Sequence, residues 1–297
     1  MKTWKYLLGP MRPPFLILAP ACVLVGLGSA YLQTGQINWL YFVLAVIAGV
    51  SAHISVNAFN EYFDFKTGVD SHTQRTPFSG GSGTLQAHPE LAKSTLIMSW
   101  VTLAITGFIG LYFMFIWNWK ALPMGILGLI LLYGYTAWAV YQPVLCLIAP
   151  GLGFGPLMVL STHFALTGTF SWRALIASMV PFFLVSNLLF LNQFPDVEAD
   201  RSAGRRHYPL LLGRTTSAYI YIAFLIAAYM VVVVGVFFHL LPPFSLLALL
   251  TLVFAVQIVR TLLANSENVP ALIPAMAQNV IINLLTPVLL AIGLFIG

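Results

Sequence analysis

Charged residues are scarce in this chain of 297 residues: Asp, Glu, Lys and Arg together make up 7% of it, and only eight residues are acidic. Cysteine is almost absent, since Cys22 and Cys146 are its two examples and both lie in apolar runs. Such a small amount of charge excludes an ordinary soluble domain. Two isolated cysteines offer no disulfide or metal-binding pattern, so they predict packing roles.

Hydrophobic residues make up 60% of the chain, with a mean hydropathy of +0.92, and they are arranged in long runs. A membrane-spanning helix needs about 20 such residues. We therefore predict an all-α polytopic membrane protein, with one domain over residues 1–297. Nine spans are expected near residues 13–33, 37–59, 94–118, 121–141, 143–168, 173–194, 217–239, 241–259 and 271–296. Residues 121–172 contain no charge, so the break at Tyr141-Gln142-Pro143 is the least distinct.

The basic residues predict the orientation of these spans, because excess Lys and Arg in short loops marks the cytoplasmic side. With the N-terminus inside, eleven basic residues fall inside: Lys2, Lys5, Arg12, Lys66, Arg75, Lys93, Arg201, Arg205, Arg206, Arg214 and Arg260. Lys120 and Arg173 fall outside, and all eight acidic residues fall inside. We expect a prokaryotic cytoplasmic membrane protein with the lipid bilayer as its surroundings. The net charge of +5 follows from this bias, and no nucleic-acid-binding module is recognisable.

Seven of the eight acidic residues lie in two stretches, within residues 61–90 and 196–200. Asn60 and Asp64 are four residues apart at the first stretch, and Asn192 and Asp196 repeat that spacing at the second. Carboxylate and amide oxygens suit a hard cation such as Mg²⁺, and through it a phosphorylated substrate. Each motif is expected where a long apolar helix runs out into a polar loop on the inner side, so both would open to the cytoplasm.

Helical spacing places these polar residues on single helix faces. His53, Asn57, Asn60 and Asp64 follow at steps of four, three and four, and Asn192, Asp196 and Asp200 at steps of four. A polar face within lipid must point to a cavity or a partner helix, so the two faces are expected to meet. The matched motifs predict two pseudo-repeated halves, roughly residues 13–141 and 143–259, followed by a last helix at 271–296. His53, His163 and His239 have no paired ligand and predict packing roles, although His53 continues the polar face.

Glycines and basic residues follow both motifs. The loop over residues 65–93 contains Gly68, Gly80, Gly81 and Gly83 together with Lys66 and Arg75. It is either a flexible connection or a cover that presents backbone N–H groups and Arg75 to phosphate. After the second motif, Arg201 and Arg205 are candidates for binding diphosphate oxygens, although the positive-inside bias accounts for some cations here.

Together these motifs resemble the UbiA superfamily of intramembrane prenyltransferases, over essentially the whole chain. Arg12-Pro13 before the first span is similar to the family's usual opening. Asn60-Glu-Tyr-Phe-Asp64 with Asp70 looks like the first motif, in the longer spacing of the menaquinone branch. Residues 77–83, Pro-Phe-Ser-Gly-Gly-Ser-Gly, and residues 192–205, followed by Leu212-Gly-Arg, are also similar to that branch.

The resemblance implies nine helices around a central cavity with a lateral opening to lipid. It also implies transfer of a polyprenyl group from polyprenyl diphosphate to an aromatic acceptor. In the menaquinone branch that acceptor is 1,4-dihydroxy-2-naphthoate, and diphosphate and CO₂ are released. The chemistry is consistent with the sequence, because a bundle in the membrane can bury the donor's tail at about 0.8 kcal/mol per CH₂. The charged head calls for Mg²⁺ and arginine.

By position in these motifs, six residues are expected to hold Mg²⁺: Asn60, Asp64, Asp70, Asn192, Asp196 and Asp200. The four carboxylates, Asp64, Asp70, Asp196 and Asp200, are the expected catalytic residues. The expected substrate-binding residues are Arg12, Asn57, Asn60, Lys66, Arg75, Tyr135, Asn192, Arg201 and Arg205.

Tyr135 also marks a departure from the family. Many members follow a tyrosine near this break with Lys or Arg, whereas this chain carries no charge between Tyr135 and Arg173. Other UbiA-type acceptors therefore stay open: 4-hydroxybenzoate, homogentisate or a glycerol phosphate lipid. A secondary transporter is the rival class and would place its sites near the bilayer midplane in broken helices. A phosphatidyl-alcohol transferase would gather its acids in one stretch, and that pattern is absent.

Overall fold

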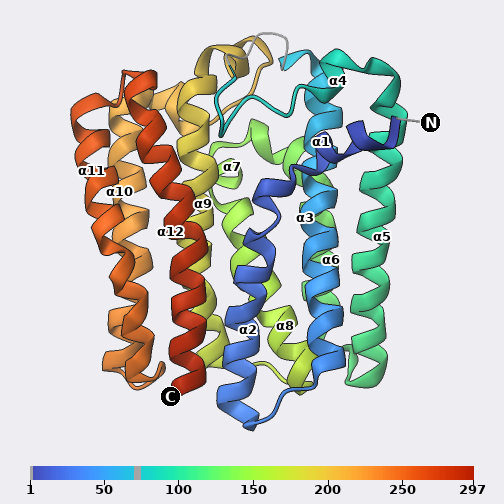
Figure 1. The fold of residues 1–297 in the computed structure, drawn as a ribbon, viewed down its shortest axis with the longest axis vertical. Coiled ribbons are helices and arrows are strands. Elements are labelled where there is room, and N and C mark those ends of the chain that lie inside the picture. Colours follow the sequence, from blue (N-terminus) through green and yellow to red (C-terminus); the bar gives the residue numbers. More distant parts are fainter. Residues whose placement is uncertain (1–2, 70–74) are drawn as a thin grey trace.

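The computed structural model describes residues 3–69 and 75–297, so Asp70 lies outside the described residues. Figure 1 shows long helices side by side along the longest axis, and the described part contains no strand. The α-helices are α1 (Leu8–Met11), α2 (Leu18–Thr34), α3 (Trp39–Thr67), α4 (Thr84–Ala87), α5 (Ala92–Ile116), α6 (Leu122–Ala137), α7 (Pro143–Leu152), α8 (Met158–Thr167), α9 (Trp172–Ser202), α10 (Tyr208–Phe237), α11 (Leu252–Asn265) and α12 (Val269–Ile296). Short 3₁₀ segments join them: η1 (Thr3–Leu7), η2 (Pro13–Phe15), η4 (Pro89–Leu91), η5 (Trp119–Ala121), η6 (Ala139–Tyr141) and η8 (Pro243–Thr251).

Nine helical segments of the described chain are long and apolar enough to cross a membrane. They run over Pro13–Thr34, Trp39–Thr67, Pro89–Ile116, Trp119–Ala137, Pro143–Thr167, Trp172–Ser202, Tyr208–Phe237, Pro243–Asn265 and Val269–Ile296. Each corresponds to one predicted span, in the same order. The prediction of an all-α polytopic membrane fold is confirmed.

The two helices that carry the motifs continue beyond the predicted ends of their spans. Helix α3 ends at Thr67, eight residues beyond the expected end of its span, and α9 continues to Ser202. Helix α3 ends where Gly68 adopts φ 75°, a left-handed conformation that glycine adopts without strain. Hydropathy marks where the lipid-facing surface ends, whereas the helix continues as long as its polar side chains have an interior to face. Asp64 and Asp200 therefore lie in the last helical turn of α3 and α9, and Asp196 lies one turn before Asp200.

The break between the fourth and fifth spans is confirmed. Helix α6 ends at Ala137, η6 turns the chain, and Pro143 begins α7. Within the fifth span, Pro150 lies near the end of α7 and Pro156 lies inside the π-helical turn that follows, η7 (Gly153–Leu157), where proline lacks the N–H of a regular helix. A Cβ atom at Gly151 would lie only 2.2 Å from the Phe182 carbonyl oxygen, so glycine permits α7 to pack closely against α9.

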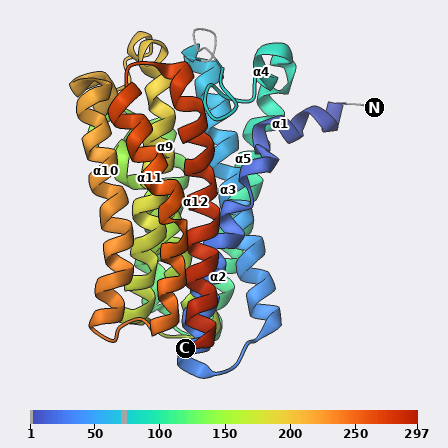
Figure 2. The same ribbon diagram turned by 60° about the vertical axis from the view of Figure 1, so that its left-hand side comes forward.

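The spans enclose an interior with the polar motifs near one end. Helix α3 packs against α5 and α2, α9 packs against α7 and α10, and α12 closes the bundle against α2 and α11. Figures 1 and 2 show the N-terminal segment, α4 and the α9–α10 connection at one end, and the C-terminus and the α2–α3 connection at the other. The outer surface carries exposed aromatic side chains such as Phe108, Phe115 and Phe237, as expected for contact with lipid. Cys22 and Cys146 are buried and free.

Candidate active site

A small polar cavity lies where the C-terminal ends of α3 and α9 meet; we call it the polar chamber. It is lined by Arg12, Asn60, Asp64, Val69, Phe78, Ser79, Gly80, Gly81, Tyr135, Val140, Cys146, Leu189, Asn192, Gln193, Asp196, Asp200, Arg205 and His207. The two motifs, far apart in sequence, therefore face one space. The expectation that Asp64 and Asp196 lie around a common cavity agrees with this geometry.

Arg205 links the two motifs directly. Its Nη2 donates to Asp64 Oδ1, and its Nη1 donates to Asp200 Oδ1 at 2.9 Å. Burial by itself would lower the pKa of Arg205, but the carboxylates of Asp64 and Asp200 outweigh it and raise that pKa above its usual value. Arg205 is thus a permanent positive charge between two carboxylates that would otherwise repel each other.

The remaining motif residues differ in how well they are satisfied. Asn60 Nδ2 donates to Asp64 Oδ2 at 3.1 Å, so the first motif is braced within α3. Asp196 Oδ1, in contrast, is buried and has no hydrogen-bond partner among the described residues. A buried carboxylate oxygen without a donor is costly, so Asp196 is a candidate position for a ligand.

His207 belongs to the polar chamber although the sequence did not single it out. Its Nδ1 accepts a hydrogen bond from the backbone N–H of Leu210 at 3.3 Å, at the start of α10. Nε2 therefore carries the proton and donates to Asp200 Oδ2 at 2.9 Å. The sequence signal for a capping role was the position of His207 directly before Tyr208-Pro209, at the start of a helix. The contact of His207 with Asp200 depends on the turn over residues 203–207.

Arg12 ties the N-terminal segment to α3. It adopts a left-handed conformation with φ 52°, and its guanidinium donates to Glu61 Oε1 from Nε at 3.0 Å and from Nη2 at 2.8 Å. Nη2 also donates to Asn60 Oδ1 at 3.1 Å. Glu61, which is fully buried, also accepts from the backbone N–H of Ser82 at 2.6 Å and from its hydroxyl at 2.9 Å. Glu61, like His207, was missed by sequence reasoning.

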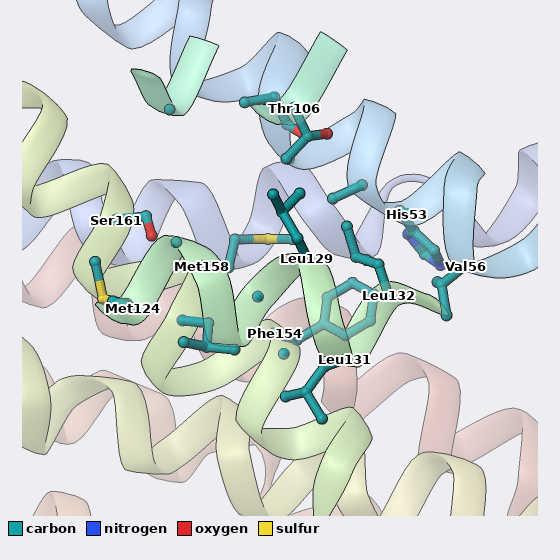
Figure 3. Close-up of a pocket in the computed structure, with 18 of the residues that line it drawn as sticks. His53, Val56, Thr106, Met124, Leu129, Leu131, Leu132, Phe154, Met158 and Ser161 are labelled. Atoms are coloured by element: carbon teal, nitrogen blue, oxygen red, sulfur yellow. The ribbon is translucent and has the colours of Figure 1, made fainter. Parts of the chain in front are cut away.

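A second, larger cavity of about 400 Å³ extends from the polar chamber into the apolar part of the bundle; we call it the apolar cavity. Six residues line both spaces: Arg12, Asn60, Phe78, Tyr135, Leu189 and Asn192. Asn57 lines the apolar cavity beside them and donates to the Met11 carbonyl oxygen at 3.0 Å. Figure 3 shows the deeper wall, where Leu129, Leu132, Phe154 and Met158 surround the space.

Three predicted substrate-binding residues are absent from the lining of both cavities. Lys66 Nζ lies 5.8 Å from the centre of the Tyr62 ring. Arg75 donates to Gln86 at 3.1 Å. Arg201 has an exposed side chain 3.7 Å from Glu198. The structure thus gathers Arg12, Asn60, Asp64, Tyr135, Asn192, Asp196, Asp200 and Arg205 in the polar chamber, with Asn57 next to it.

Residues 19–277, a range that contains both motifs, match the UbiA prenyltransferase family. The chain belongs to this family. It is a membrane-embedded prenyltransferase, and its relatives cover most of its length.

Two curated relatives of this UbiA-family chain come from bacteria. It is 29% identical over 269 residues to 2-carboxy-1,4-naphthoquinone phytyltransferase from Synechocystis, covering 87% of this chain and 82% of the relative. It is 27% identical over 289 residues to 1,4-dihydroxy-2-naphthoate octaprenyltransferase from Bacillus subtilis, covering 96% and 91%. The resemblance to the naphthoate branch is confirmed.

Solved structures share the fold of this UbiA-family chain. A UbiA homologue from Archaeoglobus fulgidus, bound to GPP and Mg²⁺, has a TM-score of 0.68 at 19% identity, with 98% of this chain and 100% of that one covered. The apo structure of a UbiA homologue from Aeropyrum pernix has a TM-score of 0.71 at 17% identity, with 96% and 98% covered.

The donor set of the polar chamber fits a divalent cation that shares its ligands with a phosphate. The described residues contain no group of three acidic, histidine or cysteine side chains able to hold a metal by themselves. Mg²⁺, however, usually takes only one or two carboxylates and fills its shell with water and substrate phosphate. Asp196 Oδ1, buried without a partner, and the amide oxygens of Asn60 and Asn192 match that requirement.

Proposed function

We propose that this enzyme transfers a polyprenyl group from polyprenyl diphosphate to 1,4-dihydroxy-2-naphthoate, a step of menaquinone biosynthesis, and releases diphosphate and CO₂. One observation carries the proposal: a polar chamber with arginines and carboxylates opens directly into a long apolar cavity. That shape suits a donor with a charged head and an apolar tail. The acceptor is inferred from the relatives in Synechocystis and Bacillus subtilis, whose names specify naphthoquinone- and naphthoate-type acceptors.

We assign Mg²⁺ to the polar chamber, held by Asn60, Asp64 and Asp70 from one side and by Asn192, Asp196 and Asp200 from the other. When bound, Mg²⁺ would neutralise the diphosphate and stabilise it as a leaving group. The Mg²⁺ in the Archaeoglobus fulgidus homologue supports this assignment. Asp70 enters it by its place in the first motif.

Arg12 and Arg205 are the favoured contacts for diphosphate oxygens, because both line the polar chamber. Guanidinium groups bind such oxygens through paired N–H donors. Arg205 would exchange at least one carboxylate for a phosphate oxygen when the donor binds. Lys66, Arg75 and Arg201 stay proposed as outer contacts that side-chain or loop movement would have to bring to the chamber.

Cleavage of the allylic carbon–oxygen bond leaves its electron pair on the diphosphate and a positive charge on the prenyl carbon. Phe78 and Tyr135, which line the junction of the two cavities, would shelter that charge from water. The electron-rich acceptor ring then forms the new carbon–carbon bond at the carbon bearing the carboxylate. The carbon–carboxylate bond breaks, its electrons return to the ring, and CO₂ leaves.

We further propose that the N-terminus and the polar chamber face the cytoplasm of a prokaryotic cell. The predicted loops carry eleven basic residues on that side and two on the other. Mg²⁺ and the soluble acceptor would then enter from the cytoplasm, while the prenyl tail would enter from the bilayer.

Purified protein incubated with radiolabelled geranylgeranyl diphosphate, Mg²⁺ and a panel of aromatic acids tests the proposal. We expect a prenylated lipid product and CO₂ with 1,4-dihydroxy-2-naphthoate, and no product after chelation of Mg²⁺. Product with 4-hydroxybenzoate, homogentisate or a glycerol phosphate instead would replace the acceptor within the same family. Uptake of a solute into liposomes without any lipid product would favour a transporter.

A further inference from the structure

His53 is a polar side chain of the apolar cavity, and it has no role in the proposed metal or diphosphate site. His53 lies on α3, lines the apolar cavity and is 6% exposed. Its Nδ1 is buried without a hydrogen-bond partner, and none of the hydrogen bonds between described residues involves this ring. The ring packs edge-to-face on Phe154, with centroids 4.7 Å apart. Figure 3 shows both side chains on the wall of the cavity.

Three other polar side chains of this wall make hydrogen bonds within the protein. Thr106 Oγ1 donates to the Ala48 carbonyl oxygen at 3.1 Å, and Thr162 Oγ1 donates to the Met158 carbonyl oxygen at 2.9 Å. Asn57 donates to the Met11 carbonyl oxygen. The hydrogen-bond donors of these three side chains are thus already used within the protein. His53 differs from them, because an imidazole without partners in an apolar cavity is unfavourable unless a ligand completes it.

The position of His53 relative to the reacting atoms limits what that ligand is. Asn60, Asn57 and His53 share one face of α3, and His53 lies about 10 Å along the helix from Asn60, at 1.5 Å per residue. The acceptor ring has to reach the first prenyl carbon at the junction with the polar chamber. A polar group on the far edge of that ring would then lie toward His53, whereas a hydrocarbon tail offers no hydrogen bond.

We infer that His53 binds the aromatic acceptor, through a hydrogen bond to a hydroxyl on the ring edge that points away from the diphosphate. This inference rests on the proposed function, and it specifies the acceptor as an arene with polar groups on opposite edges. His53 is then a specificity-determining residue that orients the ring over the prenyl carbon. It has no part in holding the metal or the diphosphate.

Steady-state kinetics of His53→Leu and His53→Gln test the inference, with the acceptor and the donor varied separately. Loss of one neutral hydrogen bond corresponds to about a tenfold effect. We expect His53→Leu to raise the acceptor KM about tenfold and to leave the donor KM unchanged. His53→Gln, which keeps hydrogen-bonding groups, should stay within about threefold of wild type. An unchanged acceptor KM in His53→Leu, or a raised donor KM in its place, would overturn the inference.

His163→Gln is the matched control. His163 is also a buried histidine of the bundle, but its Nδ1 is 2.6 Å from the Ser29 hydroxyl and it does not line the apolar cavity. We expect a lower Tm for His163→Gln with an unchanged acceptor KM. If the acceptor KM rises equally in His53→Leu and His163→Gln, the effect is due to packing and the inference is overturned.

Wild-type protein provides a second measurement that does not depend on folding of any variant. The competitor 1-hydroxy-2-naphthoate lacks the second hydroxyl, so its inhibition constant should exceed the acceptor KM for the dihydroxy acid about tenfold. Equal values would overturn the inference. Absence of product from wild type with every aromatic acid would instead defeat the proposed function. If wild type makes product and the acceptor KM of His53→Leu equals that of wild type, this inference alone would be defeated.

Discussion

At the scale of single residues, the polar chamber combines satisfied and unsatisfied carboxylates. Arg205 donates hydrogen bonds to both Asp64 and Asp200, and His207 donates a further hydrogen bond to Asp200. Asp196 keeps one buried oxygen that has no partner among residues 3–69 and 75–297. Charge compensation therefore stabilises one side of the chamber, while the other side has an acceptor that a ligand would satisfy. Substitutions at these positions should affect stability in opposite directions, although both remove activity.

Asp196→Asn and Asp64→Asn form such a pair. Asp196→Asn removes a partly desolvated charge, so we expect activity to be lost while the free energy of unfolding rises by about 1 kcal/mol. Asp64→Asn removes a partner of buried Arg205, so we expect activity to be lost and stability to fall by about 3 kcal/mol. Turnover assays and thermal unfolding in detergent measure both. Wild-type turnover in either variant would contradict the metal assignment.

His207 is expected to position Asp200 for the metal. In His207→Ala the donor to Asp200 Oδ2 and the cap of α10 are both lost. In the presence of diphosphate, Mg²⁺ is expected to raise the Tm. We expect the Mg²⁺ concentration at half of the full Tm increase to be about tenfold higher or more in this variant. Thermal unfolding at graded Mg²⁺ concentrations measures this without turnover.

His207→Asn separates the two losses. Asparagine caps helices well, so this variant should keep the stability that His207→Ala loses, about 1 kcal/mol, and still show weakened Mg²⁺ binding because its side chain is shorter. If both variants depend on Mg²⁺ as wild type does, His207 only caps α10 and does not position Asp200.

At the scale of elements, α3 holds two separate segments over the polar chamber. Arg12 from the N-terminal segment and Ser82 from the glycine-rich loop both bind Glu61, one residue after Asn60. The loop that the sequence left open as either flexible or a cover is thus fastened to the helix that carries the first motif. Its Gly80 and Gly81 line the chamber.

Glu61→Gln should release this fastening. The amide loses the charge that pairs with Arg12 and offers one oxygen acceptor in place of two, so we expect a stability loss of about 3 kcal/mol. Hydrogen exchange of residues 75–87 should rise, and the donor KM should increase. Glu198→Gln is the control, because its exposed pair with Arg201 is worth less than about 1 kcal/mol. Equal exchange in both variants would refute the fastening role.

Much of this arrangement could be predicted from the sequence because it depends on local periodicity. The nine spans followed from runs of apolar residues, and the meeting of α3 and α9 followed from the steps of four between Asn60 and Asp64 and between Asn192 and Asp196. Glu61 and His207 could not be predicted, since their partners are set by tertiary contacts. The two pseudo-repeated halves stay a prediction.

The basic residues show the limit of reasoning by proximity in sequence. Lys66 follows Asp64 by two residues, a rotation of about 200° around the helix, which turns its side chain away from the chamber. Arg201 follows Asp200 by one residue and is rotated by about 100°, so it faces solvent. Arg205 reaches the chamber because the helix ends first and the turn over residues 203–207 folds back.

At the scale of the whole molecule, the bundle contains the polar chamber and the apolar cavity in a single interior. The polar chamber is confined to one end, whereas the apolar cavity runs among α3, α5, α6, α7 and α8. Three inward positions of α5 follow at steps of four: Thr102, Thr106 and Gly110. Gly110 lines the apolar cavity, and a Cβ atom there would meet no atom within 4 Å. The space beside Gly110 is therefore available to a long prenyl tail.

Gly110→Phe should limit the length of the prenyl chain. The added ring would occupy part of a cavity of about 400 Å³, so long donors should lose the burial of several CH₂ groups, each worth about 0.8 kcal/mol. We expect kcat/KM for the longest accepted donor to fall at least tenfold, while that for geranyl diphosphate changes less than twofold. Competition between donors of different length, read by mass of the product, measures this shift. Ile105→Phe places the same aromatic ring on the exposed side of the same helix and should leave the length preference unchanged. An equal loss for short and long donors in Gly110→Phe would mean that the tail follows another path through the bundle.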